Sequence, residues 1–272
     1  MSRSWKRNFS SVVRAKKRFG QNFLKDRTIL EQIIKAIPDD DYQLVEIGAG
    51  LGDLTKYLLV SNGVVAFEID LDLCNYLNSK FSEELENGKL ELFCKDVIAV
   101  WREELYSEKY KIVANLPYYI ATNIIFKALQ DRNCKSITAM VQKEVADKFV
   151  AKVGEKNFSM LSVVAQSAGK VVKVVDVPPT AFQPMPKVYS AVVQFRKEIE
   201  TISHHFISFL QIAFKQPRKT LLKNLSQHYE RDRLETLFFK LNLNLSIRPH
   251  QVDTPIYHQI YQTLEDREIG RE

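Results

Sequence analysis

A chain of 272 residues exceeds the common size of one domain, so we expect one large domain and a smaller one. Hydrophobic residues make up 45% of the chain, and no apolar run approaches the roughly 20 residues that cross a bilayer. The three cysteines are isolated and odd in number, which predicts a reducing compartment and argues against a disulfide framework or a zinc site.

The net charge of +6 is concentrated in a basic N-terminal arm. Residues 1–25 contain eight lysines and arginines and no acidic residue. A second basic cluster, without an intervening acid, comprises Lys215, Arg218, Lys219 and Lys223. Two such patches on a nearly neutral body are typical of contacts with a phosphate backbone, whereas a solvated tail and a solvated helix face are the alternative. An organellar transit peptide over residues 1–20 is a third reading, which we rank below an RNA-binding arm.

Strand-like and helix-like patterns alternate along the first two thirds of the chain. The apolar runs that predict strands are Gln43–Gly48, Val64–Asp70, Lys89–Lys95, Lys111–Leu116 and Ser136–Gln142. The amphipathic stretches that predict helices are Leu54–Leu59, Leu71–Phe81, Asn123–Asp131, Lys143–Val150 and Met160–Ala168. This alternation predicts an α/β fold with a mostly parallel sheet and helices on both of its faces.

The pattern changes after residue 168. Two further β-rich runs, Lys170–Val177 and Ala191–Arg196, flank the proline-rich loop Pro178–Lys187. A loop of this length suits an antiparallel pairing, which we expect at the edge of the sheet.

The last part of the chain is helical in periodicity and contains no strand-like run. The helical pattern covers residues 204–241 and 255–265. We therefore predict a large α/β domain over residues 1–198, including the basic arm, and a small all-helical domain over residues 199–272.

A glycine-rich turn joins the first predicted strand to the helix that follows it. Gly48, Gly50 and Gly52 permit a tight turn and the close approach of a ligand to the backbone. Their spacing differs from the dinucleotide fingerprint Gly-x-Gly-x-x-Gly. Asp53 at the helix start would repel a pyrophosphate but is compatible with a ligand that carries an amino acid and a sulfonium cation. A purely structural turn is the alternative.

Carboxylates stand at the ends of the next two predicted strands. Glu68 lies 20 residues after Gly48, where a carboxylate is placed to accept hydrogen bonds from ribose hydroxyls. Asp96 can accept from an adenine amino group while Val97 packs on the ring. Each acid alone is more often a helix N-cap. Together with the glycine turn they predict an adenosine pocket.

The tetrapeptide Asn115-Leu116-Pro117-Tyr118 ends another predicted strand and is the most informative stretch of the chain. Ligands of open α/β sheets bind outside the carboxyl ends of the strands. The Asn115 side-chain oxygen and the Leu116 carbonyl can accept both hydrogens of one exocyclic amino group, and the Tyr118 ring can stack on the base that carries it. The tetrapeptide therefore predicts a planar nucleobase or amide whose amino nitrogen reacts, with an ordinary turn as the alternative.

Several stretches, in this order, resemble the ribosomal RNA adenine dimethyltransferase family over residues 14–265. The matching stretches are KRFGQNFL at 17–24, EIGAGLGDLT at 46–55, NLPY at 115–118, QKEV at 142–145, VPPTAFQPMPKV at 177–188 and RKTL at 218–221. The resemblance implies a Rossmann-like methyltransferase fold and S-adenosylmethionine as methyl donor. It also implies dimethylation of adenine N6 in small-subunit (16S) ribosomal RNA during ribosome assembly.

The resemblance further implies roles for individual residues. The donor would be bordered by Asn22, Leu24, Gly48, Gly50, Glu68, Asp96, Val97 and Asn115. The target adenine would be held by Asn115, Leu116, Tyr118 and Phe182, the last two as a sandwich. Contacts with RNA would come from Arg14, Lys16, Lys17, Arg18, Lys187, Lys215, Arg218, Lys219 and Lys223. We expect a cytoplasmic monomer without a metal, whose helical domain binds RNA.

Two positions depart from the family pattern, and three other functions stay open. Ala121 stands in place of a common Ser, and Met160 in place of a common Arg, which puts in doubt an RNA or domain contact of that Arg. The alternatives are a resistance methylase acting on large-subunit RNA, a nicotinamide oxidoreductase, and an assembly factor that keeps the fold without turnover. The glycine spacing argues against the oxidoreductase.

Overall fold

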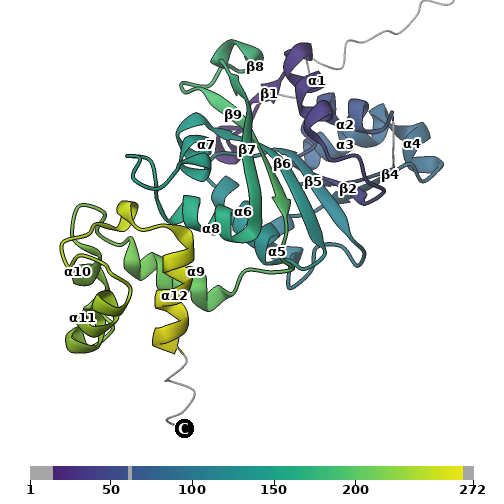
Figure 1. The fold of residues 1–272 in the computed structure, drawn as a ribbon. Helices are drawn as coiled ribbons and strands as arrows, with labels where there is room; N and C mark the ends of the chain where they lie inside the picture. Colours follow the sequence, from purple (N-terminus) through teal and green to yellow (C-terminus); the bar gives the residue numbers. More distant parts are fainter. Residues whose placement is uncertain (1–14, 61–62, 266–272) are drawn as a thin grey trace, which may run out of the picture.

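The computed structural model describes residues 15–60 and 63–265, which form a seven-stranded sheet flanked by helices and a group of helices near the C-terminus (Figure 1). The strands are β1 (Phe23–Leu24), β2 (Gln43–Ile47), β3 (Val64–Glu68), β4 (Leu90–Cys94), β5 (Tyr110–Asn115), β6 (Cys134–Gln142), β7 (Gly169–Val177), β8 (Phe182–Gln183) and β9 (Ser190–Lys197). The α-helices are α1 (Arg27–Ala36), α2 (Asp53–Leu58), α3 (Leu71–Lys80), α4 (Ser82–Glu86), α5 (Val97–Val100), α6 (Ala121–Gln130), α7 (Lys143–Val150), α8 (Met160–Ala168), α9 (His204–Ala213), α10 (Leu221–Leu225), α11 (Arg231–Lys240) and α12 (Thr254–Glu265). Short 3-10 helices are η2 (Lys17–Phe19), η3 (Pro179–Ala181) and η4 (Pro249–Gln251).

The large sheet has the strand order β4-β3-β2-β5-β6-β9-β7. Strands β4, β3, β2, β5 and β6 are parallel, and β9 runs antiparallel to both of its neighbours. The predicted βαβ alternation is therefore confirmed. The antiparallel pair is also confirmed, with β7 at the sheet edge and β9 between it and β6.

The central strands β2, β3 and β5 alternate their side chains between two apolar layers, because successive residues on a strand point to opposite faces. On one face Leu44, Ala66 and Val113 pack among residues of α1, α2 and α3. On the other face Val45 and Ile112 pack among residues of α5, α6, α7 and α8. The expected cover of helices on both faces is confirmed.

A second, two-stranded sheet was not predicted from the sequence. Strand β1 pairs antiparallel with β8, with Leu24 opposite Phe182, and Figure 1 shows these distant segments side by side. The Lys25 N–H donates to the Ala181 carbonyl, 2.8 Å away, which extends the same contact. Strands of two residues have no periodicity to detect. This small sheet fixes the N-terminal segment beside the loop before β9.

The helices α9 to α12 gather at one end of the molecule (Figure 1). They contact α8 through Ser167 Oγ and His258 Nε2, 2.8 Å apart, and through Thr254 Oγ1 and Gln166 Oε1, 2.6 Å apart. The division into two domains at residue 199 stays a prediction. No helix within residues 15–60 and 63–265 is long and apolar enough to cross a membrane.

The expectation for the cysteines is wrong for two of them. Cys74 forms a disulfide bond with Cys94, whereas Cys134 is free and buried. Cys74 lies in the first turn of α3, and Cys94 ends β4 opposite Glu68 of β3, so the parallel strand register brings the two Cα atoms to 6.0 Å. A spacing of 20 residues gives no such signal in the sequence. The isolated cysteines of the sequence therefore did not predict this pairing.

Asp131, which follows α6, connects three segments at the amino ends of the strands. Its side chain is buried and accepts hydrogen bonds from Trp101 Nε1 (3.0 Å), Tyr110 Oη (2.6 Å) and the backbone N–H groups of Leu105 and Asn133 (2.8 Å each). Buried donors that lose a charged acceptor are costly, because each then lacks any partner.

We expect Asp131→Ala to lower the free energy of unfolding by on the order of 3 kcal/mol, because four donors lose one acceptor. Urea unfolding followed by circular dichroism measures the effect. Glu103→Ala, at an exposed position in the loop after α5, is the control and should change stability by about 0.5 kcal/mol or less. A loss at Asp131 no larger than that of the control would contradict the role of this carboxylate.

Candidate active site

A cavity of about 250 Å³ lies at the carboxyl ends of β2, β3, β4 and β5. The chain passes from β2 to β3 on one side and later returns to β5 on the other, and ligands of open α/β sheets bind at such a switch point. The cavity is lined by nine of the residues selected from the sequence: Asn22, Gly48, Gly50, Glu68, Asp96, Val97, Asn115, Leu116 and Tyr118. Motifs far apart in the sequence therefore converge on one cavity.

Two selected residues lie outside this cavity. Leu24 lines a neighbouring cavity of about 40 Å³, which it shares with Gly48, Gly50 and Asn115. Phe182 lines neither of these cavities; it is 6% exposed and packs in the apolar layer that contains Leu24. Tyr118 is thus the aromatic of the predicted sandwich that faces the cavity, and the role of Phe182 stays a prediction.

The glycine-rich turn has a backbone that only glycine adopts without strain. Gly48, Gly50 and Gly52 have φ values of +78°, +59° and +71°. A Cβ atom at Gly52 would lie 2.4 Å from the Phe81 ring. Packing against Phe81 therefore accounts for the glycine at position 52.

Asp53, at the start of α2, does not line the larger cavity. Its carboxylate accepts a hydrogen bond from Lys25 Nζ at 2.5 Å. The negative charge of Asp53, which the sequence made compatible with a cationic ligand, is therefore balanced by Lys25 of the N-terminal segment.

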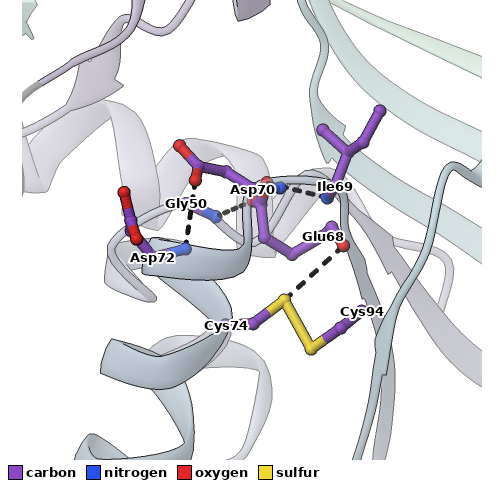
Figure 2. The surroundings of a disulfide bond; sticks show 7 residues. All are labelled: Gly50, Glu68, Ile69, Asp70, Asp72, Cys74 and Cys94. Carbon is purple, nitrogen blue, oxygen red and sulfur yellow. Dashed lines mark hydrogen bonds between the residues drawn. A yellow bond between two sulfur atoms is a disulfide. The ribbon is translucent and has the colours of Figure 1, made fainter.

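Glu68 connects the glycine turn to the start of α3 (Figure 2). Its Oε2 accepts from the Gly50 N–H, and its Oε1 accepts from the N–H groups of Ile69 and Asp70, all at 2.9 Å. Burial raises the pKa of this carboxyl group. Each carboxylate oxygen has about two acceptor sites, so Oε2 keeps one for a further donor. A ribose hydroxyl is compatible with that site.

The Asn115 side chain is held at the end of β5 by the N-terminal segment. Its Nδ2 donates to the Asn22 carbonyl at 2.9 Å, which leaves the side-chain oxygen to accept from another group. The Leu116 N–H donates to the Met140 carbonyl at 3.2 Å, so the peptide after the strand keeps its place in the sheet. The Asn115 amide and the Asn115–Leu116 peptide are thus held in place, and the Leu116 carbonyl follows in the next peptide.

The Tyr118 ring is fixed by its hydroxyl group. The Tyr118 Oη and Ser190 Oγ atoms are 2.6 Å apart, and burial raises the pKa of the tyrosine hydroxyl. Because Ser190 begins β9, the ring bridges the end of β5 and the antiparallel edge of the sheet.

The structure separates the predicted RNA-binding residues into two groups. Lys16 Nζ forms ion pairs with Asp70 and Asp72, each at 2.5 Å, so its charge is neutralised within the protein. The other predicted RNA-binding cations that the structure describes are exposed and form no ion pair within the described residues. They are Lys17, Arg18, Lys187, Lys215, Arg218, Lys219 and Lys223. Arg14 lies outside the described residues. In the same part of the chain no group of three or more His, Cys, Asp or Glu could hold a metal ion.

Sequence reasoning gave no role to Gln21 or Asp70, which the structure joins by a hydrogen bond of 2.9 Å. Gln21 lines the cavity beside Asn22. The available signals were the place of Gln21 within the matching stretch at 17–24 and the place of Asp70 two residues after Glu68. The contact itself joins residues 49 positions apart and has no local pattern.

Comparison with known proteins decides the family. The family model described as ribosomal RNA adenine dimethylase matches residues 12–266. The chain belongs to this family. Like the family, it is an adenine dimethyltransferase with the Rossmann-like methyltransferase fold, as the sequence predicts.

Individual relatives are about half identical to this dimethyltransferase over nearly its whole length. The protein called ribosomal RNA small subunit methyltransferase A from Sulfurimonas denitrificans is 52% identical over 258 residues, which cover 95% of this chain and 97% of the relative. The protein of the same name from Helicobacter hepaticus is 47% identical, and the match covers 93% of each chain.

Solved structures of related enzymes have the same fold. A dimethyladenosine transferase from Plasmodium falciparum matches with a TM-score of 0.74 and 28% identity, over 91% of this chain and 98% of the other. The 23S rRNA methyltransferase ErmE matches with a TM-score of 0.67 and 25% identity, over 90% of this chain and 100% of the other.

Glu46 of this dimethyltransferase begins the matching stretch at 46–55 and lies under the glycine turn. The residue is 1% exposed and borders the smaller cavity, and its Oε2 has no hydrogen-bond partner among the described residues. Burial raises its pKa to about 8. A buried site of this kind favours the uncharged form of the carboxyl group.

The raised pKa makes stability depend on pH. The Glu46 carboxyl binds its proton more tightly in the folded protein, so its contribution is full below its ordinary pKa of 4.5 and declines as the pH rises to about 8. We expect Glu46→Gln to remove this decline and to stabilise the protein at the upper end of the range by a few kcal/mol, to order of magnitude. Thermal melts across the range measure it, with the exposed Glu86→Gln as control. Parallel curves for wild type and Glu46→Gln would contradict the assignment.

Proposed function

We propose that this protein transfers two methyl groups to N6 of adenines in small-subunit ribosomal RNA, with S-adenosylmethionine as donor. The observation that best supports this proposal is the hydrogen bond from Asn115 Nδ2 to the Asn22 carbonyl, 2.9 Å long, beside the cavity. Identity supports the small-subunit substrate: 52% to a small-subunit methyltransferase against 25% to the 23S enzyme.

The cavity residues fit the proposed donor. Gly50 and Glu68 line one wall, where Oε2 of Glu68 keeps an acceptor site for a ribose hydroxyl. Asp96 Oδ1 accepts from the Ile98 N–H at 2.9 Å, so Oδ2 remains for an adenine amino group, and Val97 offers an apolar face. When bound, the donor supplies an electrophilic methyl group on a sulfonium ion.

The protein activates the target amine by holding it. An adenine amino nitrogen is a poor nucleophile, because its lone pair is delocalised into the ring. The Asn115 side-chain oxygen and the Leu116 carbonyl would accept its two hydrogens, favour a pyramidal nitrogen and direct the lone pair toward the methyl group. The nitrogen–carbon bond would form as the bond between the methyl group and the sulfonium sulfur breaks, with the electron pair of the broken bond going to the sulfur, and the methylated ammonium would then lose its proton to solvent. Orientation of this kind contributes up to about 7–11 kcal/mol in favourable cases.

Tyr118 supplies an aromatic face for the target base. Taking a base out of its stack costs a few kcal/mol, and stacking on an aromatic side chain returns about 1–3 kcal/mol per base. The hydrogen bond to Ser190 holds the Tyr118 ring in one orientation before the base arrives. Phe182 is proposed as the second face.

Binding of the RNA itself is assigned to the exposed cations. Lys17, Arg18 and Lys187 lie in the α/β part of the chain. A cluster near α10 consists of Lys215, Arg218, Lys219 and Lys223. We extend the proposal to a helical domain over residues 199–272 that binds RNA. We also propose that the protein is a cytoplasmic monomer and that it acts, without a metal, on the assembling small subunit.

We expect Asn115→Ala to lower the rate of transfer by at least about 100-fold, because the acceptor that directs the lone pair is lost. Labelled methyl incorporation into undermethylated small ribosomal particles measures the rate, and calorimetry confirms that the donor still binds. Asn78→Ala, at an exposed position of α3, is the matched control. Near-normal turnover by Asn115→Ala would rule out the role of the amide. Labelling of large-subunit particles instead would overturn the proposed substrate.

We expect the triple variant Arg218→Gln, Lys219→Gln and Lys223→Gln to bind RNA more weakly. The slope of log affinity against log salt should fall by about three, one for each lost phosphate contact. Titrations at several salt concentrations measure it. The control replaces Arg27, Lys148 and Arg231, which pair with acids on their own helices. Equal slopes for the two triple variants would show that the cluster is only a solvated surface.

A further inference from the structure

We infer that Gln21, held by Asp70, is a positioning residue that sets the Asn115 amide for methyl transfer. The inference rests on the role of Asn115 proposed above. The N-terminal segment 16–25 has little regular structure of its own, namely one turn of 3-10 helix and a two-residue strand. It nevertheless forms a wall of the cavity, through Phe19 to Phe23. Contacts with other segments must therefore hold this wall in place.

Asp70 makes those contacts from a buried position. It is 2% exposed, and its side chain caps α3 by accepting from the Asp72 N–H at 3.1 Å. Its Oδ1 accepts from Lys16 Nζ at 2.5 Å, and its Oδ2 accepts from Gln21 Nε2 at 2.9 Å. Burial by itself would raise the pKa of Asp70, but the bonds from Lys16 and Gln21 more than offset it and lower the pKa, so the carboxylate stays ionised.

Gln21 uses both ends of its amide. While Nε2 donates to Asp70, Oε1 accepts from the Lys16 N–H at 2.7 Å. The glutamine thereby closes the loop between residues 16 and 21 and anchors it to the start of α3. Its own backbone then delivers the next residue, Asn22, to the end of β5.

The Asn22 carbonyl decides which end of the Asn115 amide meets the target. A carboxamide rotated end for end exchanges its donor and its acceptor. The bond from Asn115 Nδ2 to the Asn22 carbonyl assigns the nitrogen to the segment and the oxygen to the amine. If the Asn22 peptide moves, the amide loses the contact that selects this orientation.

The same network extends to the donor wall. The Asp70 N–H donates to Glu68 Oε1, and Glu68 Oε2 accepts from the Gly50 N–H (Figure 2). Gly50, Glu68, Asp70 and Gln21 therefore form one continuous chain of hydrogen bonds. Asp70 links the wall proposed for the donor to the segment that orients the Asn115 amide. Loss of the Gln21 contact should therefore affect transfer more than folding.

The test is single-turnover methyl transfer by Gln21→Ala at saturating donor, on undermethylated small ribosomal particles. We expect the rate to fall by up to about 100-fold, the effect of a misplacement near 1 Å. The loss should exceed any change in the donor dissociation constant, and the melting temperature should stay near that of wild type. Arg27→Ala, which removes an exposed hydrogen-bonded pair of α1, is the control and should transfer normally.

A double-mutant cycle tests the shared path. If Gln21→Ala and Asp70→Asn act through one contact, the double variant should lose less than the product of the two single losses. Three results would overturn the inference. They are an unchanged transfer rate for Gln21→Ala, a rate loss no larger than the loss of donor affinity, and a rate loss in the double variant equal to the product of the two single losses. Inactive Asn115→Ala beside a fully active Gln21→Ala would defeat this inference alone, whereas an active Asn115→Ala would defeat the proposed role of the amide.

Discussion

One hydrogen bond, from Asn115 Nδ2 to the Asn22 carbonyl, joins the two halves of this site. The sheet supplies Asn115 at a strand end, and a segment with almost no regular structure supplies Asn22. An amide that is free to rotate presents either a donor or an acceptor, and only the acceptor can hold an amino hydrogen. In the proposed mechanism, methyl transfer therefore depends on how firmly residues 16–25 are attached to the rest of the fold.

That attachment places charged groups where water is scarce. Glu46, Glu68 and Asp70 are all buried beneath or beside the glycine turn, and burial disfavours the ionised form of each. The three carboxyl groups differ in what compensates their burial. Asp70 has a lysine partner, Glu68 has three backbone N–H donors, and Glu46 takes up a proton more readily. Unfavourable burial of this kind is typical of functional sites.

The large sheet and most of the cavity could be predicted because each depends on local patterns. Runs such as Val64–Glu68 are short and apolar, as is typical of a buried strand, and the acids and amides end or directly follow such runs, so parallel strands bring them to one edge. The small sheet, the Cys74–Cys94 bond and the pairing of Lys16 with Asp70 depend on contacts between distant segments. No period or motif encodes such contacts. The burial of Phe182 was missed for the same reason, since it follows from the pairing of β8 with β1.

The neutralised charge of Lys16 changes how the basic arm is understood. The sequence presents Lys16, Lys17 and Arg18 as one run, yet the structure turns the first inward to Asp70 and leaves the other two exposed. The exposed pair lies on η2, directly before the residues that line the cavity. An RNA phosphate bound to this pair would therefore contact the segment whose Asn22 carbonyl holds the Asn115 amide. In the proposed function, RNA recognition and the orientation of the Asn115 amide therefore involve the same segment, so RNA that binds Lys17 and Arg18 would act on the wall that positions this amide.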